Sequence, residues 1–74
     1  MKKIEIEVEI DGQMYKGHKT ISSNKYGKFQ TIYLTDKIHE RDQGAYATDP
    51  AKDTMAIFVA KNILSSLVRT HLLR

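Results

Sequence analysis

The sequence contains no cysteine, which excludes a disulfide and any zinc site built on thiolate ligands. A chain without cysteine suits a reducing compartment, and we expect a cytoplasmic protein. Long apolar runs are also absent: residues 55–60, MAIFVA, are far too short to cross a bilayer, which takes about 20 residues. The charged, alternating start MKKIEIEVEI is unlike a signal peptide. We therefore expect no membrane partner.

The chain is also short and only mildly charged. Its 74 residues are near the lower limit for a domain that folds on its own core, so we expect one domain over 1–74. Twelve Lys and Arg residues against nine Asp and Glu residues give a net charge of +3. A surplus this small is compatible with nucleic acid, with an acidic protein partner or with solubility alone.

A β-hairpin is the clearest structural prediction. Across residues 2–10, β-branched side chains alternate with charged ones, so one face of a strand meets the core and the other, mostly acidic face meets water. Asp11-Gly12 is typical of two-residue hairpin turns, and the second strand follows at 13–21. The predicted cross-strand pairs are Val8 with Tyr15, Glu7 with Lys16, and Glu5 with His18.

Less regular sequence follows the hairpin. Residues 22–28 are rich in Ser, Asn and Gly and predict a loop, after which residues 28–34 predict a third strand. Both faces of that strand are partly apolar, so the pattern leaves open which face meets the core. Residues 35–48 are polar, with a short fourth strand at Gly44 to Ala47 as an option.

The last third of the chain predicts one helix over residues 50–73. Asp49 would cap it, and Pro50 would occupy its first turn, where a missing N–H is harmless. The predicted fold class is α+β: an antiparallel meander of three strands, or four, packed on one long C-terminal helix (βββα). Apolar side chains recur at helical spacing and predict the buried face, formed by Ala56, Ala60, Ile63, Leu64 and Leu67.

This helix carries more apolar side chains than one small sheet would cover. A helix over 50–73 would be about 36 Å long, whereas strands of seven to nine residues are about 23–30 Å long. We therefore predict an overhanging helix end and a homodimer, the alternative being a last turn that frays in water. The predicted self-association residues are Phe58, Leu67, Val68, Leu72 and Leu73.

Nothing in the sequence indicates an enzyme, a metal site or a cofactor. His39, Glu40 and Asp42 are metal-ligand types, but they share one polar segment, where solvation explains them equally well. No serine has a histidine at a motif spacing, and the glycines do not form a phosphate-binding loop. We predict a non-enzymatic protein without cofactors.

The segment NKYGKF, residues 24–29, is the candidate binding feature. Lys25 and Lys28 would neutralise phosphates while Tyr26 and Phe29 stack on bases or sugars. The alternative is an ordinary turn, in which Gly27 allows the chain to reverse and the lysines keep it soluble.

Short motifs carry a resemblance to a known family. They are Tyr15-Lys16-Gly17, Gly27-Lys28-Phe29, Lys37-Ile38-His39 and Gly44-Ala45-Tyr46, followed by a helix with Ala51, Ala56 and Ala60. Over residues 15–62 the chain resembles the DNA-binding domain of plant ethylene-response factors, whose fold the amino-terminal domains of some phage and transposon integrases share. The resemblance implies a sheet-plus-helix DNA-binding fold. The sequence departs from the family in lacking tryptophan, in having no arginine before Arg41 and in its added acidic strand at the N-terminus.

Two functions follow as hypotheses. The first is a small nucleic-acid-binding module, an accessory protein of a phage or mobile element. The alternative is a protein-binding inhibitor or adaptor that acts through a sheet edge or the C-terminal helix, and a domain without a ligand of its own is also compatible with the sequence. The candidate nucleic-acid contacts are Lys16, Lys19, Lys25, Tyr26, Lys28 and Lys37.

Overall fold

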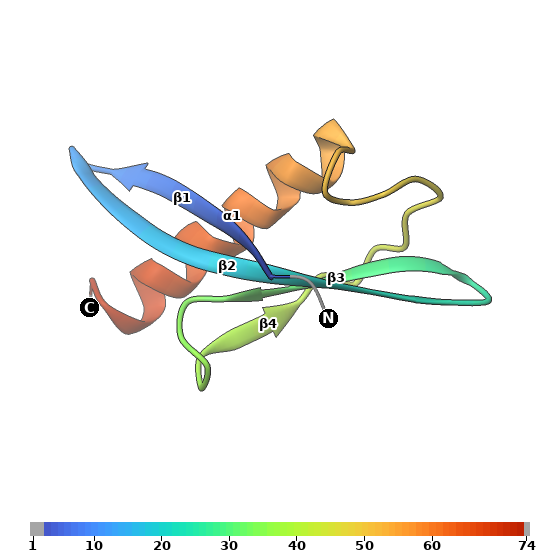
Figure 1. The fold of residues 1–74 in the computed structure, drawn as a ribbon. Coiled ribbons are helices and arrows are strands. Elements are labelled where there is room, and N and C mark those ends of the chain that lie inside the picture. Colours follow the sequence, from blue (N-terminus) through green and yellow to red (C-terminus); the bar gives the residue numbers. More distant parts are fainter. Residues whose placement is uncertain (1–2, 74) are drawn as a thin grey trace.

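A four-stranded antiparallel sheet forms one layer of the molecule and a helix forms the other (Figure 1). The structure is a computed structural model and describes residues 3–73. The strands lie in the sheet in chain order, which confirms the predicted α+β meander packed on a C-terminal helix. The elements are β1 (Lys3–Ile10), β2 (Gln13–Asn24), β3 (Gly27–Tyr33), β4 (His39–Arg41) and α1 (Thr54–His71).

The first hairpin has the predicted turn and register. Asp11 and Gly12 have φ angles of 52° and 83°, the positive values that a tight two-residue turn requires. Val8 pairs with Tyr15, which places the β1 isoleucines on the helix side and the β1 glutamates on the helix-free side. The alternation in the sequence therefore sets the orientation of the whole sheet.

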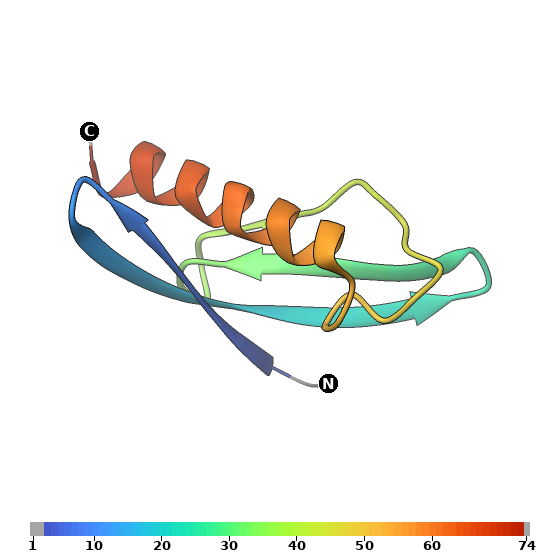
Figure 2. The same cartoon turned by 90° about the horizontal axis from the view of Figure 1, so that it is seen from above.

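The second hairpin is longer than the sequence predicted. Residues 22–24, predicted as loop, continue β2, and Lys25 and Tyr26 form the turn. Backbone pairing needs no apolar side chain, and the Asn24 side-chain oxygen accepts a 2.7 Å hydrogen bond from the Tyr26 N–H, which closes the turn. This hairpin tip extends beyond the helix layer (Figures 1 and 2).

The fourth strand lies at His39–Arg41 and not at residues 44–47. The Thr35 hydroxyl accepts from the Ile38 N–H at 3.1 Å, so the chain reverses directly after β3 and pairs with it at once. Tyr46 still reaches the sheet, through one isolated bridge to Lys28.

The helix begins four residues later than Pro50, and the predicted cap at Asp49 is wrong. Asp53 is the cap, and its carboxylate accepts the Ala56 N–H at 3.1 Å. Pro50 is buried, and its carbonyl oxygen accepts a hydrogen bond from Lys19 of β2. Residues 49–52 form a turn that precedes the helix and is separate from it.

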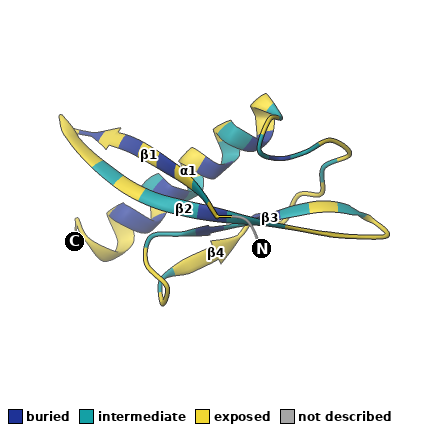
Figure 3. Cartoon of the chain, in the orientation of Figure 1, coloured by how far each residue is buried: buried dark blue, intermediate teal, exposed yellow. Residues whose placement is uncertain are grey.

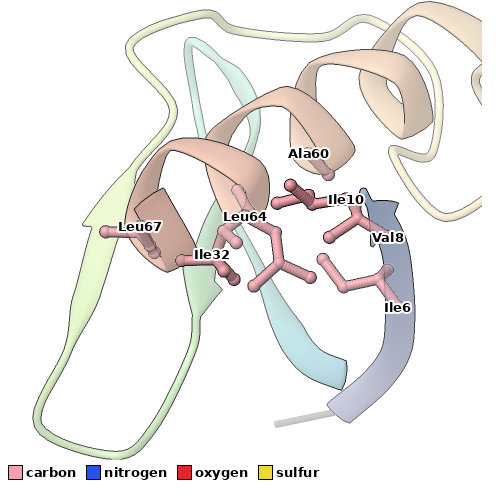
Figure 4. Close-up of a cluster of buried hydrophobic side chains, with 8 residues drawn as sticks. Ile6, Val8, Ile10, Ile32, Ala60, Leu64 and Leu67 are labelled. Carbon is pink, nitrogen blue, oxygen red and sulfur yellow. The ribbon is translucent and has the colours of Figure 1, made fainter. Parts of the chain in front are cut away.

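The core lies between β1, β3 and the helix (Figures 3 and 4). The inward face of β3, left open by the sequence, is that of Gln30 and Ile32. Leu64, fully buried, projects from the helix into the centre of this cluster. Its buried members are Ile6, Val8, Ile10, Ile32, Ala60, Leu64, Leu67 and Val68.

Candidate nucleic-acid interface

The helix-free face of the sheet carries a row of three aromatic rings. His18, Tyr33 and His39 are direct cross-strand neighbours on β2, β3 and β4. The His18 and Tyr33 rings are stacked, with centroids 4.8 Å apart and planes 5° from parallel. The Tyr33 and His39 rings follow at 5.0 Å with a tilt of 33°. The side-chain alternation of each strand places this row opposite the helix, so it is not part of the core.

A cation and a second aromatic group extend the row along β3 and β4. The Arg41 guanidinium lies 4.9 Å from the centroid of the Phe29 ring, within the range of a cation–π contact. Arg41 is exposed. A guanidinium held over a ring keeps its N–H groups free for a phosphate, and it can also stack on a base.

A hollow of about 390 Å³ borders His18 on the β1 side. Lys16 and Lys3 supply positive charge to its wall, and Glu5 supplies a hydrogen-bond acceptor. The acidic row of β1 (Glu5, Glu7, Glu9) runs along the same side of the sheet and gives this edge negative charge.

The predicted contact residues do not form one cluster. Lys16 lies on the helix-free face, next to the hollow. Lys25 and Tyr26 are at the tip of the second hairpin, where the lysine ammonium lies 5.1 Å from the tyrosine centroid and the tyrosine is 74% exposed. Lys37 lies in the turn at the opposite end of β3, and Lys28 faces the helix side of the sheet, where it is exposed.

Lys19 was wrongly predicted as a phosphate contact. It pairs with Ile4 on the helix side of the sheet and is only 1% exposed. Its Nζ donates to Gln30 Oε1 and to the Pro50 carbonyl, both at 3.0 Å. Burial lowers the pKa of Lys19, while the carboxylates of Asp49 and Asp42 act in the opposite direction.

Lys19 is one end of a buried polar network that joins the sheet to the helix. Gln30 Nε2 donates to Asp42 Oδ2 at 2.8 Å and to the Ala56 carbonyl at 2.9 Å. Asp42 also accepts from the Tyr46 hydroxyl and, at 2.9 Å, from the Gly44 N–H. Burial acts to raise the pKa of Asp42, but these hydrogen bonds and the charge of Lys19 outweigh it, and the pKa is lowered.

The structure separates Asp42 from His39 and Glu40, the three residues of metal-ligand type that the sequence analysis considered together. Asp42 is 6% exposed and its oxygens are occupied, while His39 and Glu40 are exposed on β4. Within residues 3–73 no group of three His, Cys, Asp or Glu side chains is placed to hold a metal ion. In the same range, no helix is long and apolar enough to span a membrane.

No family model matches the chain, and no curated protein or solved structure matches it. The likeness to ethylene-response DNA-binding domains therefore stays a prediction from short motifs.

Tyr46 provides a pH-dependent test of the network. Burial, followed by its hydrogen bond to Asp42 and the charge of that carboxylate, raises the pKa of Tyr46 from 10.0 to about 12. The resulting contribution to stability is complete below the unfolded pKa of 10.0 and is lost as the pH rises through the folded value. We expect an ultraviolet titration to show one tyrosine ionising near pH 12, and Tyr46→Phe to remove that step. If the step persists in Tyr46→Phe, the assignment is wrong; Tyr26→Phe, at the exposed hairpin tip, is the matched control.

Proposed function

We propose that the chain is a small nucleic-acid-binding module that holds single-stranded DNA or RNA on the helix-free face of its sheet. The observation that carries the proposal is the ring row His18–Tyr33–His39, flanked by the Arg41–Phe29 pair. Tyr33 is stacked between the two histidines, so a base would stack on the outer face of His18 or of His39, at the ends of the row.

The geometry favours a single strand that crosses β2, β3 and β4. A base that enters the hollow beside His18 would lie within reach of Lys16, and Arg41 would contact a phosphate at the other end of the row. The acidic row of β1 repels phosphate and so limits the path on one side. Duplex DNA is a weaker candidate, since its bases are already stacked on one another.

The test is binding of short fluorescent oligothymidine and oligouridine, measured by anisotropy at two salt concentrations. We expect His18→Ala, which removes the end ring beside the hollow, to weaken binding about tenfold or more, since base stacking on a ring is worth about 1–3 kcal/mol. Arg41→Ala should weaken binding and also flatten its salt dependence. Lys61→Ala, which removes an exposed cation from the helix, should leave affinity nearly unchanged.

Two results would count against the proposal. One is the absence of binding at low salt. The other is binding that depends on Tyr26 at the hairpin tip and does not change in His18→Ala, which would place the interface at the hairpin. Circular dichroism of each variant separates loss of binding from loss of fold.

The homodimer also stays a prediction, and fewer of the predicted self-association residues are exposed than the sequence analysis expected. Leu67 and Val68 belong to the core, 6% and 0% exposed, so they cannot serve as the predicted dimer contacts. The helix is shorter than predicted at both ends, which removes most of the overhang. Phe58, Leu72 and Leu73 remain exposed, at 61%, 54% and 42%.

A further inference from the structure

The outer edge of β1 is the long open edge of the sheet. β1 is the first strand in the sheet order and, among the described residues, pairs only with β2. The opposite edge is β4, which has three residues against eight in β1. A strand edge of this length is a template for another strand, because a row of its N–H and C=O groups has no partner in the sheet.

The hairpin turn determines which backbone groups point outward. In a two-residue hairpin the residues that flank the turn, Ile10 and Gln13, exchange both hydrogen bonds, and the pattern alternates along the strand. The β1 isoleucines therefore bond to β2. The N–H and C=O groups of Glu5, Glu7 and Glu9 point to the open edge.

A groove with both apolar and charged side chains lies along the same stretch of β1. The N-terminal half of β1 diverges from the start of the helix layer (Figure 2), and a groove of about 400 Å³ lies between them. Its apolar lining is Ile4 and Ile6 on β1, with Ala51 and Ile57 opposite. Charged side chains complete the lining: Glu5, Glu7, Lys16, Lys19 and Lys61. Ile4 and Ile57 are half-buried, so apolar surface remains for a side chain that enters from the edge.

The charge of β1 indicates whether its open edge would pair with β1 of a second copy of the chain or with a strand of a different protein. On the helix-free side, β1 presents Glu5, Glu7 and Glu9 in succession. Antiparallel pairing of β1 with another β1 would bring glutamates face to face, and like charges directly opposite each other destabilise a sheet. A strand with Lys or Arg at alternate positions would instead form opposite-sign pairs along the whole row.

We propose that the open edge of β1 binds an extended basic segment of another protein, in which Lys or Arg alternates with branched apolar residues. Its backbone pairs with the outward groups of Glu5, Glu7 and Glu9. The basic side chains lie beside those carboxylates, and the apolar ones enter the groove at Ile4 and Ile57. This interface shares Glu5 with the hollow beside His18 but uses no ring of the row, and it does not depend on nucleic-acid binding.

The test uses a capped synthetic peptide of about six residues with the sequence Lys-Ile-Lys-Val-Lys-Ile, titrated into the full chain and followed by amide NMR. We expect shifts along β1 and at Ile57. Glu7→Lys should weaken binding about tenfold at low salt, whereas Glu40→Lys makes the same change of charge on β4 and should not. A peptide with Glu in place of Lys should not bind.

A second pair of variants tests the backbone contact itself. Because the Glu7 N–H points away from β2, Glu7→Pro removes an edge donor without removing a bond of the hairpin. Glu7→Ala removes the same carboxylate but keeps the donor. We expect Glu7→Pro to bind the peptide more weakly than Glu7→Ala. Equal binding by these two variants, shifts confined to other strands or no binding at all would each overturn the proposal.

Discussion

Replacing Gln30 with leucine is expected to lower the free energy of unfolding by about 3–5 kcal/mol. Gln30 is 1% exposed, and its amide joins two charged groups: it accepts from Lys19 and donates to Asp42. Leucine has a similar size but cannot bond to either partner. A buried ammonium and a buried carboxylate would each lose a hydrogen bond, and the Ala56 carbonyl would lose its donor from Gln30. For so small a domain this is a large part of the total stability.

Urea unfolding followed by circular dichroism measures this loss. Gln43→Leu makes the same substitution at an exposed position and should change stability by less than about 0.5 kcal/mol. Adding Lys19→Met to Gln30→Leu should recover part of the loss, since the buried charge is then gone. A cost below about 1 kcal/mol for Gln30→Leu would show that water replaces the amide, and the network would not have the role assigned to it.

The local parts of this fold were predictable from the sequence. The β1–β2 register follows from alternation and a two-residue turn, both of which lie within one short segment. The buried helix stripe with Leu64 follows from periodicity in the same way. The helix start was misplaced because Asp49-Pro50 has the pattern of a cap, whereas a distant lysine captures the proline carbonyl.

The buried network was only partly visible in the sequence. The predicted pairing of Val8 with Tyr15 already places Lys19 on the inward face, opposite Ile4. Because lysine side chains are rarely buried, Lys19 was nevertheless predicted to be exposed. Its partners Gln30 and Pro50 are 11 and 31 residues away, and no local pattern announces contacts at that separation.

The ring row was hidden for a related reason. Strand alternation places Tyr33 on the same face as Phe29, but the sequence does not say which face of β3 meets the core, and the structure shows that Gln30 faces inward. His39 joins the row only because β4 forms directly after β3, whereas the sequence analysis gave residues 44–47 as an option for a fourth strand. The candidate lysines were predicted from their charge alone. Charge does not show that Lys25 and Lys37 lie at opposite ends of β3.

Gly17→Val is expected to destabilise the protein by about 3 kcal/mol, although valine is the better strand former. Gly17 lies on the inward face of β2, next to the Leu64 side chain of the helix. A Cβ at this position would lie 2.4 Å from the Tyr33 carbonyl oxygen and 2.7 Å from Leu64 Cδ1. The leucine end can rotate away, but the carbonyl belongs to the sheet backbone and cannot yield without disturbing β3.

The direction of the stability change shows whether side-chain packing or the strand preference of valine dominates at this position. Ser23→Val makes a comparable change on β2 at an exposed position, and there the preference of valine for strands should give a small gain or no change. The unfolding temperature should therefore fall for Gly17→Val and should rise or stay the same for Ser23→Val. Combining Gly17→Ala with Leu64→Ala should not restore stability, because the clash with the Tyr33 carbonyl remains and a cavity is added. If Gly17→Val unfolds at the wild-type temperature, the Tyr33 carbonyl does not block a side chain at position 17, and the packing explanation is wrong.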